Sequence, residues 1–132
     1  LGVPVIAVGQ DELPAFWSRA SGLRAPLRMD DPADIARAHR MRRTLGIPGG
    51  QLVANPIPAE AEIPADLLAP HIARALREAG EQGIAAKSVT PFLLSRIFEL
   101  TEGRSLEANI ALVLNNARLA ARIATELTSL PG

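Results

Sequence analysis

Residues 105–130 read SLEANIALVLNNARLAARIATELTSL, which is the longest uninterrupted helical pattern in the chain. At about 100° per residue, its apolar side chains fall on two neighbouring stripes of one helix. The first stripe consists of Leu106, Ile110, Val113, Ala117, Ala120 and Ala124, and the second of Leu112, Leu119 and Ile123. We expect both stripes to pack inward, and a face this broad needs two neighbours, one of which could be another subunit. Ser105 is expected to cap the helix.

Three asparagines interrupt this helix. Asn109 and Asn116 fall between the stripes and are expected to face the body of the protein, whereas Asn115 falls on the opposite, solvated side. A buried carboxamide must find partners, because an unpaired buried polar group costs about 1–3 kcal/mol. Neighbouring backbone can supply those partners. Alternatively, the donor and acceptor of the carboxamide suit sugar hydroxyls, phosphate oxygens or a nucleobase edge.

The composition bounds the class of protein. The chain has 132 residues, and its 14 Lys and Arg balance 14 Asp and Glu, so net charge does not direct it to nucleic acid or to a membrane surface. Such a length supports one core, hence one domain or part of one. Cysteine is absent, which excludes disulfides and thiolate metal sites. These features predict a cytoplasmic protein, and the start at Leu1, without an initiator methionine, suggests an interior piece.

Short apolar runs predict the sheet of an α/β fold. Residues 2–9, GVPVIAVG, are typical of a strand buried on both faces, and residues 26–29 can form a brief strand. Residues 51–55, QLVAN, predict a further strand that stops at Pro56. Asn55 then lies at a strand's carboxyl end, where open α/β sheets bind ligands. A rigid Asn-Pro turn without any ligand explains Asn55 equally well.

Helices are expected between and after these strands. An Asp-Asp-Pro start predicts a helix over residues 30–45. A second is expected over residues 63–82, with Pro70 limiting its regular part to the residues after the proline. A third begins with Thr90 as its cap and Pro91 in its first turn. The side chains expected to be buried in these helices are Ile35, Ala38, Met41, Leu45, Leu67, Leu68, Ile72, Ala75, Leu76, Ala79, Phe92, Leu93, Ile97 and Leu100.

Residues 11–22 join the first two strands. Asp11 can cap a short helical turn, and a polar loop comes after that turn. Ser18, Arg19 and Ser21 of that loop could form an anion cradle. An ordinary surface turn with a solvated arginine explains the same residues more simply.

Other candidates for chemistry are weak. Lys87 is the only lysine, and it lacks the apolar surroundings that a Schiff-base nucleophile needs, so a solvated or phosphate-facing role is favoured. The basic run RAHRMRR at residues 37–43 has no aromatic stacking platform and is interpreted as a solvated face. His39 and His71 are expected to be half-buried surface residues. No metalloprotease, serine hydrolase or nucleotide-binding motif occurs, so the residues alone do not name a reaction.

Four stretches carry a family resemblance. They are LPAFWSRASG (13–22), GGQLVANPIP (49–58), TPFLLSR (90–96) and SLEANIALVLNNARLAARIA (105–124). In this order they resemble the carboxyl-terminal part of the pseudouridine-5′-phosphate glycosidase family, which includes indigoidine synthase A-like proteins. The resemblance implies a single α/β/α layered domain with a mostly parallel or mixed sheet, of which residues 1–132 form the carboxyl-terminal portion. It also implies a homotrimer.

The resemblance further implies an activity. This is the reversible cleavage of the carbon–carbon glycosidic bond of pseudouridine 5′-phosphate to uracil and ribose 5-phosphate, helped by a divalent metal, usually Mn²⁺. In the family a lysine forms an imine with the opened ribose, a glutamate is the general acid, and an aspartate holds the water shell of the metal. All three precede this segment in the family sequence. No catalytic residue or metal ligand is therefore expected here, and the isolated chain should be inactive and poorly soluble.

The resemblance also indicates site residues. The family's active-site asparagine corresponds by motif register to Asn109, and we expect Asn116, Asn55 and Lys87 to be further substrate-binding candidates. Asn116 could instead only hold the helix in place. Two alternatives remain open. One is a non-catalytic α/β scaffold or assembly module derived from this fold, and the other is an enzyme of indigoidine pathways that releases a different base from the same sugar phosphate.

Overall fold

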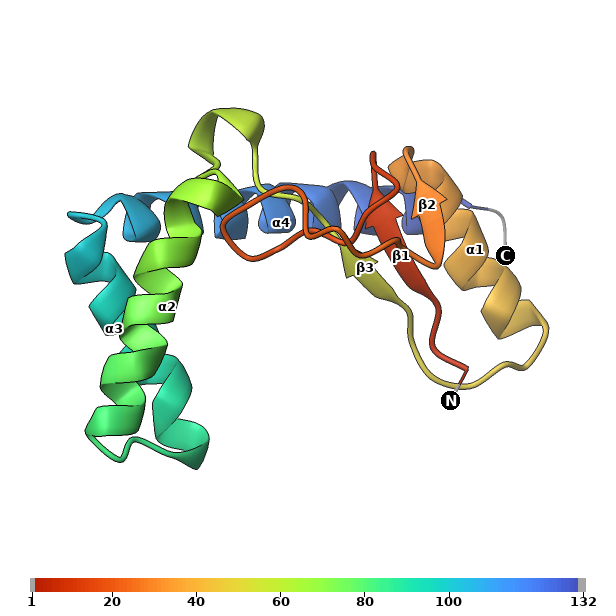
Figure 1. Ribbon diagram of the computed structural model, residues 1–132. Helices are drawn as coiled ribbons and strands as arrows, with labels where there is room; N and C mark the ends of the chain where they lie inside the picture. Colours follow the sequence, from red (N-terminus) through yellow and green to blue (C-terminus); the bar gives the residue numbers. More distant parts are fainter. Residues whose placement is uncertain (1, 131–132) are drawn as a thin grey trace.

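The computed structural model describes residues 2–130 and has an α/β fold (Figure 1). Its elements are β1 (Val5–Val8), β2 (Leu27–Met29), α1 (Pro32–Thr44), β3 (Leu52–Ala54), the 3₁₀ turn η1 (Ala59–Ala61), α2 (Ala65–Glu81), the 3₁₀ turn η2 (Ala86–Ser88), α3 (Val89–Leu100) and α4 (Arg104–Ser129). Figure 1 shows the sheet and α1 at one end and the α2–α3 hairpin at the other. The long helix α4 runs past both and connects them.

The sheet has three parallel strands in the order β2-β1-β3. Ile6 of the central strand pairs with Leu27 on one side and with Val53 on the other. Ile6 and Ala7 point to opposite faces of the sheet and are 1% and 0% exposed, so both faces of β1 are covered, as its apolar run predicts. All three predicted strands are confirmed. Asn55 comes directly after β3 and lies at the carboxyl edge of the sheet.

Helix α1 begins as its sequence predicts. The Asp31 side chain accepts a hydrogen bond of 2.9 Å from the backbone N–H of Ala33, and Pro32 is the first helical residue. The prediction that Met41 and Leu45 are buried is wrong, since they are 57% and 64% exposed. The Arg40 Nη2 donates a hydrogen bond of 3.2 Å to the carbonyl of Leu130, just past the end of α4. Met41 and Leu45 are exposed because the end of α1 extends beyond this contact.

Three predictions about the helical hairpin are wrong. Helix α2 runs through Pro70, because the proline lies near its start and the carbonyl that loses a hydrogen bond belongs to Asp66, which is exposed to solvent. Thr90 is not a cap, since η2 continues directly into α3 at Val89. Leu67 and Leu76 of α2 are also 55% and 50% exposed rather than buried.

The start of α4 also differs from the prediction. Ser105 lies inside the first turn, and the cap position is occupied by Gly103 with a φ of +87°. That left-handed conformation favours glycine and allows α3 and α4 to meet at a tight corner. None of the helices described over residues 2–130 is long and apolar enough to cross a membrane.

The main core lies between the loop after β1, the hairpin and α4. Its buried members are Trp17, Ile57, Ile63, Leu68, Ala75, Ile97, Ala108 and Leu112. The second predicted stripe of α4 agrees with this arrangement, because Leu112 is buried and Leu119 and Ile123 are half-buried. The first stripe is not covered within residues 2–130: its large side chains are about half exposed, because α1, α3 and η1 contact α4 from its other side.

Candidate functional site

The carboxyl end of β3 is joined to the middle of α4 by asparagine side chains. The Asn55 Nδ2 donates a hydrogen bond of 3.1 Å to the Asn116 Oδ1, and the Asn115 Nδ2 donates one of 3.0 Å to the Pro56 carbonyl. Two of the four predicted site residues, Asn55 and Asn116, are therefore in direct contact.

The predicted orientations of Asn115 and Asn116 are reversed in the structure. Asn115 is half-buried and bonded to backbone, whereas Asn116 is exposed apart from its bond to Asn55. The helical pattern identified two apolar stripes but could not show which side of α4 contacts the sheet. The side of α4 that meets the rest of the chain contains Ala108, Leu112 and Asn115, and Asn116 lies at its border.

Asn109 lines a cavity of about 340 Å³ between α3, α4 and the loop after β1. The residues that line this cavity are Trp17, Leu94, Phe98, Ser105, Leu106 and Asn109. Within residues 2–130 the Asn109 carboxamide has no hydrogen-bond partner, so its donors and its acceptor are available to a ligand. We call this space the Asn109 pocket. Mostly apolar walls with one convergent polar group are typical of small-molecule sites.

Asn109 and Asn116 lie on the same side of α4. They are seven residues apart, which corresponds to two turns and to about 10 Å along the helix axis. The Asn109 pocket and the Asn55–Asn116 pair are thus two polar positions on one side of α4. A ligand in the pocket would contact Asn109, and only an extended one would reach Asn116.

Trp17 forms the wall of the pocket that the loop after β1 contributes. Its indole Nε1 donates a hydrogen bond of 3.0 Å to the Ser105 carbonyl, and its own carbonyl accepts one of 2.9 Å from the N–H of Ile63. The neighbouring Ser18 Oγ donates to the Ile63 carbonyl at 2.7 Å. These bonds join the loop after β1 to the loop after η1 and to α4. No sequence pattern assigned Trp17 to the site, and its being the only tryptophan in the chain was the available signal.

The helical turn predicted in this loop is wrong, and neither interpretation of its polar residues holds. The favoured one left Arg19 solvated, but its guanidinium donates a hydrogen bond to the Ile57 carbonyl. Residues 11–17 form no helix, and Glu12 instead forms an isolated antiparallel bridge with Arg24. Ser18, Arg19 and Ser21 each donate a side-chain hydrogen bond to a backbone carbonyl, so they brace the loop and do not converge on an anion. These bonds connect segments distant in sequence, which local patterns do not reveal.

Lys87 is not near the three asparagines. It lies in η2, which links α2 to α3, and this link forms the end of the hairpin farthest from α4 (Figure 1). Its side chain is exposed. The structure therefore gives Lys87 no place in the Asn109 pocket.

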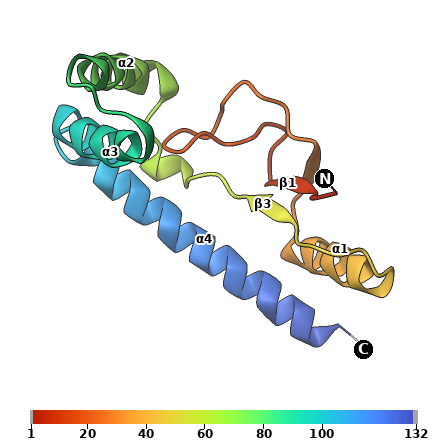
Figure 2. The same cartoon turned by 90° about the horizontal axis from the view of Figure 1, so that it is seen from below.

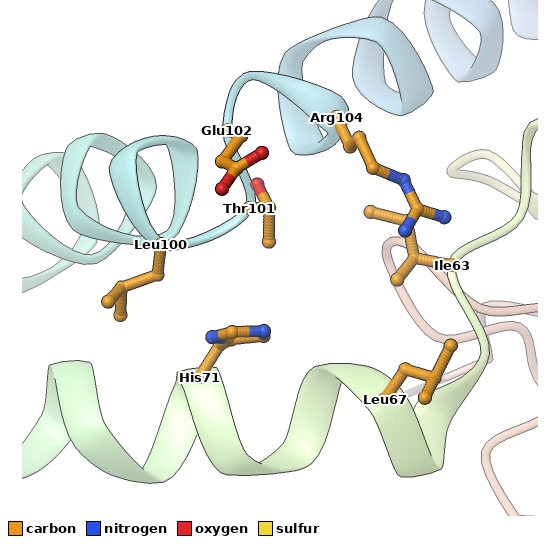
Figure 3. Close-up of a pocket in the computed structure, with 7 residues that line it drawn as sticks. All are labelled: Ile63, Leu67, His71, Leu100, Thr101, Glu102 and Arg104. Atoms are coloured by element: carbon orange, nitrogen blue, oxygen red, sulfur yellow. The ribbon is translucent and has the colours of Figure 1, made fainter.

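A second, smaller cavity lies between α2 and the corner that joins α3 to α4 (Figure 3). Its volume is about 180 Å³, and it is lined by Ile63, Leu67, His71, Leu100, Thr101, Glu102 and Arg104. Figure 3 shows the His71 ring pointing from α2 towards the corner, and His71 is half-buried as predicted. None of the four predicted site residues lines this cavity.

Acidic and histidine side chains are the remaining candidates for holding a metal. In the part of the chain that the structure describes, no three of them are grouped so that they could hold an ion. One charge cluster joins Glu78 to Arg74 and Arg96 and bridges α2 and α3. Hydrogen bonds from Arg96 and then Arg74 lower the pKa of Glu78 to about 2. This cluster connects two helices and faces neither cavity.

Comparisons with known proteins place these features in a family. The chain is 73% identical over 129 residues to a pseudouridine-5′-phosphate glycosidase of Paracoccus denitrificans (strain Pd 1222), and the match covers 98% of this chain and 42% of the relative. It is 67% identical over 129 residues to the protein of that name from Jannaschia sp. (strain CCS1), with 98% and 43% covered. The chain thus spans about two fifths of the length of these relatives and matches their carboxyl-terminal part.

Two solved structures share the fold. One is the prealnumycin C-glycosynthase AlnA in complex with ribulose 5-phosphate, with a TM-score of 0.86 and 30% identity, covering 97% of this chain and 42% of that one. The other is an indigoidine synthase A-like protein from Thermotoga maritima, with a TM-score of 0.80 and 36% identity, covering 95% and 41%. The family model described as indigoidine synthase A like protein matches residues 1–126. The chain therefore belongs to the indigoidine synthase A-like family.

Proposed function

We propose that this chain is the carboxyl-terminal part of a pseudouridine-5′-phosphate glycosidase, and we call the complete polypeptide the full-length protein. The substrate would be pseudouridine 5′-phosphate, cleaved reversibly to uracil and ribose 5-phosphate. The main support is the 73% identity over 129 residues to a relative of that name. A second support is the likeness to a C-glycosynthase in complex with ribulose 5-phosphate. The names of that protein and of the glycosidase relative both refer to a carbon-linked glycoside and to a pentose phosphate.

The proposed reaction breaks the bond between C1′ of the ribose and C5 of the uracil. A proton is added to C5 of the base, and water supplies the oxygen that C1′ carries in ribose 5-phosphate. A lysine amine forms an imine with C1′ of the opened sugar, and hydrolysis of that imine returns the amine. We place the lysine and the general-acid glutamate in the part of the full-length protein outside residues 1–132. Lys87 is not proposed as the nucleophile, because it is exposed at the far end of the hairpin.

Within this chain the proposed contact with substrate is Asn109. Its carboxamide has both donors and an acceptor, and these match the adjacent N–H and C=O groups of a uracil edge. The aromatic and apolar walls formed by Trp17, Leu94 and Phe98 suit the faces of a planar base. Asn55 and Asn116 satisfy each other, so we assign them first to holding α4 against the end of β3.

The proposal also includes a divalent metal, a homotrimer and a cytoplasmic location. Residues 2–130 do not fit a metal ion, since no suitable group of three acidic or histidine side chains occurs among them. We therefore place the metal-holding aspartate outside this chain, and none of the reaction steps given above uses the ion.

The proposed trimer can be tested by measuring the mass of the full-length protein in solution.

The experiment that tests the mechanism traps the imine. The full-length protein is incubated with ribose 5-phosphate and borohydride and then digested, and the masses of its peptides are measured by mass spectrometry. We expect one reduced sugar-phosphate adduct on a lysine outside residues 1–132, with equal yield in a Lys87→Arg control. An adduct on Lys87 would contradict the placement of the nucleophile. A folded, metal-loaded protein that forms no adduct would favour the non-catalytic scaffold.

A further inference from the structure

One side of α4 carries large apolar side chains that no described element covers. Leu106, Ile110, Val113 and Leu114 are 48%, 52%, 57% and 49% exposed. Four alanines continue the same side towards the end of the helix, and each is exposed: Ala117, Ala120, Ala121 and Ala124. We call these eight residues the α4 apolar patch.

The patch is one continuous surface. At about 100° per residue its members fall within about 120° of the helix circumference. At the start of α4 it extends onto α3, because Leu106 shares the Asn109 pocket with Leu94 and Phe98, which are 39% and 43% exposed. Figure 2 shows the sheet, η1 and α1 along one side of α4 and no ribbon along the other. An uncovered apolar surface of this extent marks an interaction site.

The border of the patch runs past the asparagines. On the helical projection Asn109 and Asn116 lie between the patch and the buried side formed by Ala108 and Leu112. Whatever covers the patch must therefore pass beside the open side of the Asn109 pocket.

The comparisons indicate what covers the patch. The chain matches 97% of its own length to a solved structure at a TM-score of 0.86, yet this match takes up only 42% of that polypeptide. The relatives from Paracoccus and Jannaschia show the same proportion, at 42% and 43%. The helices and the sheet of this chain are therefore arranged as in that solved structure, and more than half of the family polypeptide must pack around them. The patch has no charged member, so it suits a hydrophobic surface and not a polyanion.

We propose that the α4 apolar patch is the surface on which the remaining part of the family polypeptide packs. This packing makes α4 a central helix of the full-length protein and closes the Asn109 pocket on its open side. The packing itself rests on the family match alone. Only the closing of a substrate pocket rests on the proposed function.

Thiol labelling tests this packing without using activity. Residues 1–132 contain no cysteine, so Val113→Cys or Ala117→Cys within the patch and Arg118→Cys beside it each place one thiol in this part of the protein. Each variant of the full-length protein is labelled under native conditions, and the peptide containing the new thiol is monitored by mass spectrometry. We expect the two patch thiols to react at least about 100-fold more slowly than the Arg118→Cys thiol, at every protein concentration. After denaturation all three should react alike.

Two results would overturn the proposal. Patch thiols that react as fast as the Arg118→Cys thiol would show that the patch is open. Protection that disappears on dilution, together with a fall in molecular mass, would show that a second copy covers it instead. Because labelling needs no substrate, a protein that fails to release uracil but protects the patch would refute the proposed function and leave this packing standing.

Discussion

The indole nitrogen of Trp17 and the backbone carbonyl of Ser105 form a hydrogen bond of 3.0 Å across 88 positions of sequence. In an α-helix the same carbonyl also accepts the N–H of the residue four positions later, which here is Asn109. The bond therefore fixes the loop after β1 directly against the helical turn that carries the candidate substrate contact. The Asn109 pocket owes its shape to this long-range link.

Replacing the indole tests that link. Trp17→Phe keeps an aromatic ring but removes the donor, so we expect the free energy of unfolding of the full-length protein to fall by about 1–2 kcal/mol. The neighbouring Phe16 is 48% exposed and makes an edge-on ring contact with Trp17, so Phe16→Leu serves as the control and should cost less. Urea unfolding measures both. Equal losses would mean that the Trp17–Ser105 bond contributes nothing beyond ring packing.

The Asn55–Asn116 contact predicts a coupling between two positions 61 residues apart. Asn55→Ala, Asn116→Ala and the double variant form a cycle, and we expect a coupling free energy of about 0.5–1 kcal/mol in urea unfolding. The reason is that either single change already breaks the same bond. Strictly additive losses would indicate that the two side chains act independently.

Glu78 predicts how the hairpin responds to acid. Hydrogen bonds from Arg96 and Arg74 lower its pKa from 4.5 to about 2, so its stabilising effect is complete above about pH 4.5 and disappears as the pH falls towards 2. Glu78→Gln should therefore lower the melting temperature at neutral pH, and the difference from the parent should shrink between pH 4.5 and 2. Glu81→Gln on the same helix is the control. A difference that stays constant with pH would contradict this interpretation.

Two glycines should respond to alanine in opposite directions. Gly103 has a φ of +87°, and an added Cβ would lie 3.5 Å from the Phe98 ring, so Gly103→Ala should destabilise by about 1–2 kcal/mol. Gly80 lies within α2 with nothing within 4 Å of an added Cβ, so Gly80→Ala should stabilise by about 0.5–1 kcal/mol. Thermal unfolding of both variants measures the signs. A stabilising Gly103→Ala would show that the corner does not require the left-handed conformation.

The elements that could be predicted from the sequence are those that depend on interactions between neighbouring residues. The apolar run of β1, the Asp31 cap of α1 and the strand end at Asn55 each depend on neighbouring residues, and the structure confirms all three. The helical periodicity of α4 was likewise visible. It could not show which apolar stripe is buried, because that depends on where α1, α3 and η1 lie around the helix.

The site was only partly predictable for the same reason. Asn109 and Asn55 stood out by position on a helix and at a strand end. The contact of Asn116 with Asn55, the burial of Asn115 and the position of Trp17 depend on bonds between segments 59 to 88 residues apart. No periodic pattern in one segment encodes such partners. Lys87 stood out as the only lysine, yet the hairpin places it at the end away from α4.

The most direct test of the central claim is uracil release from pseudouridine 5′-phosphate by the full-length protein and its Asn109→Ala variant. We expect the parent to release uracil and the variant to lose about 10- to 100-fold in kcat/KM, since one or two hydrogen bonds to the base are lost. Lys87→Arg should behave as the parent, and the melting temperature of Asn109→Ala should be unchanged because its carboxamide bonds nothing within residues 2–130. A folded parent that releases no uracil, or an Asn109→Ala variant with full activity, would contradict the account.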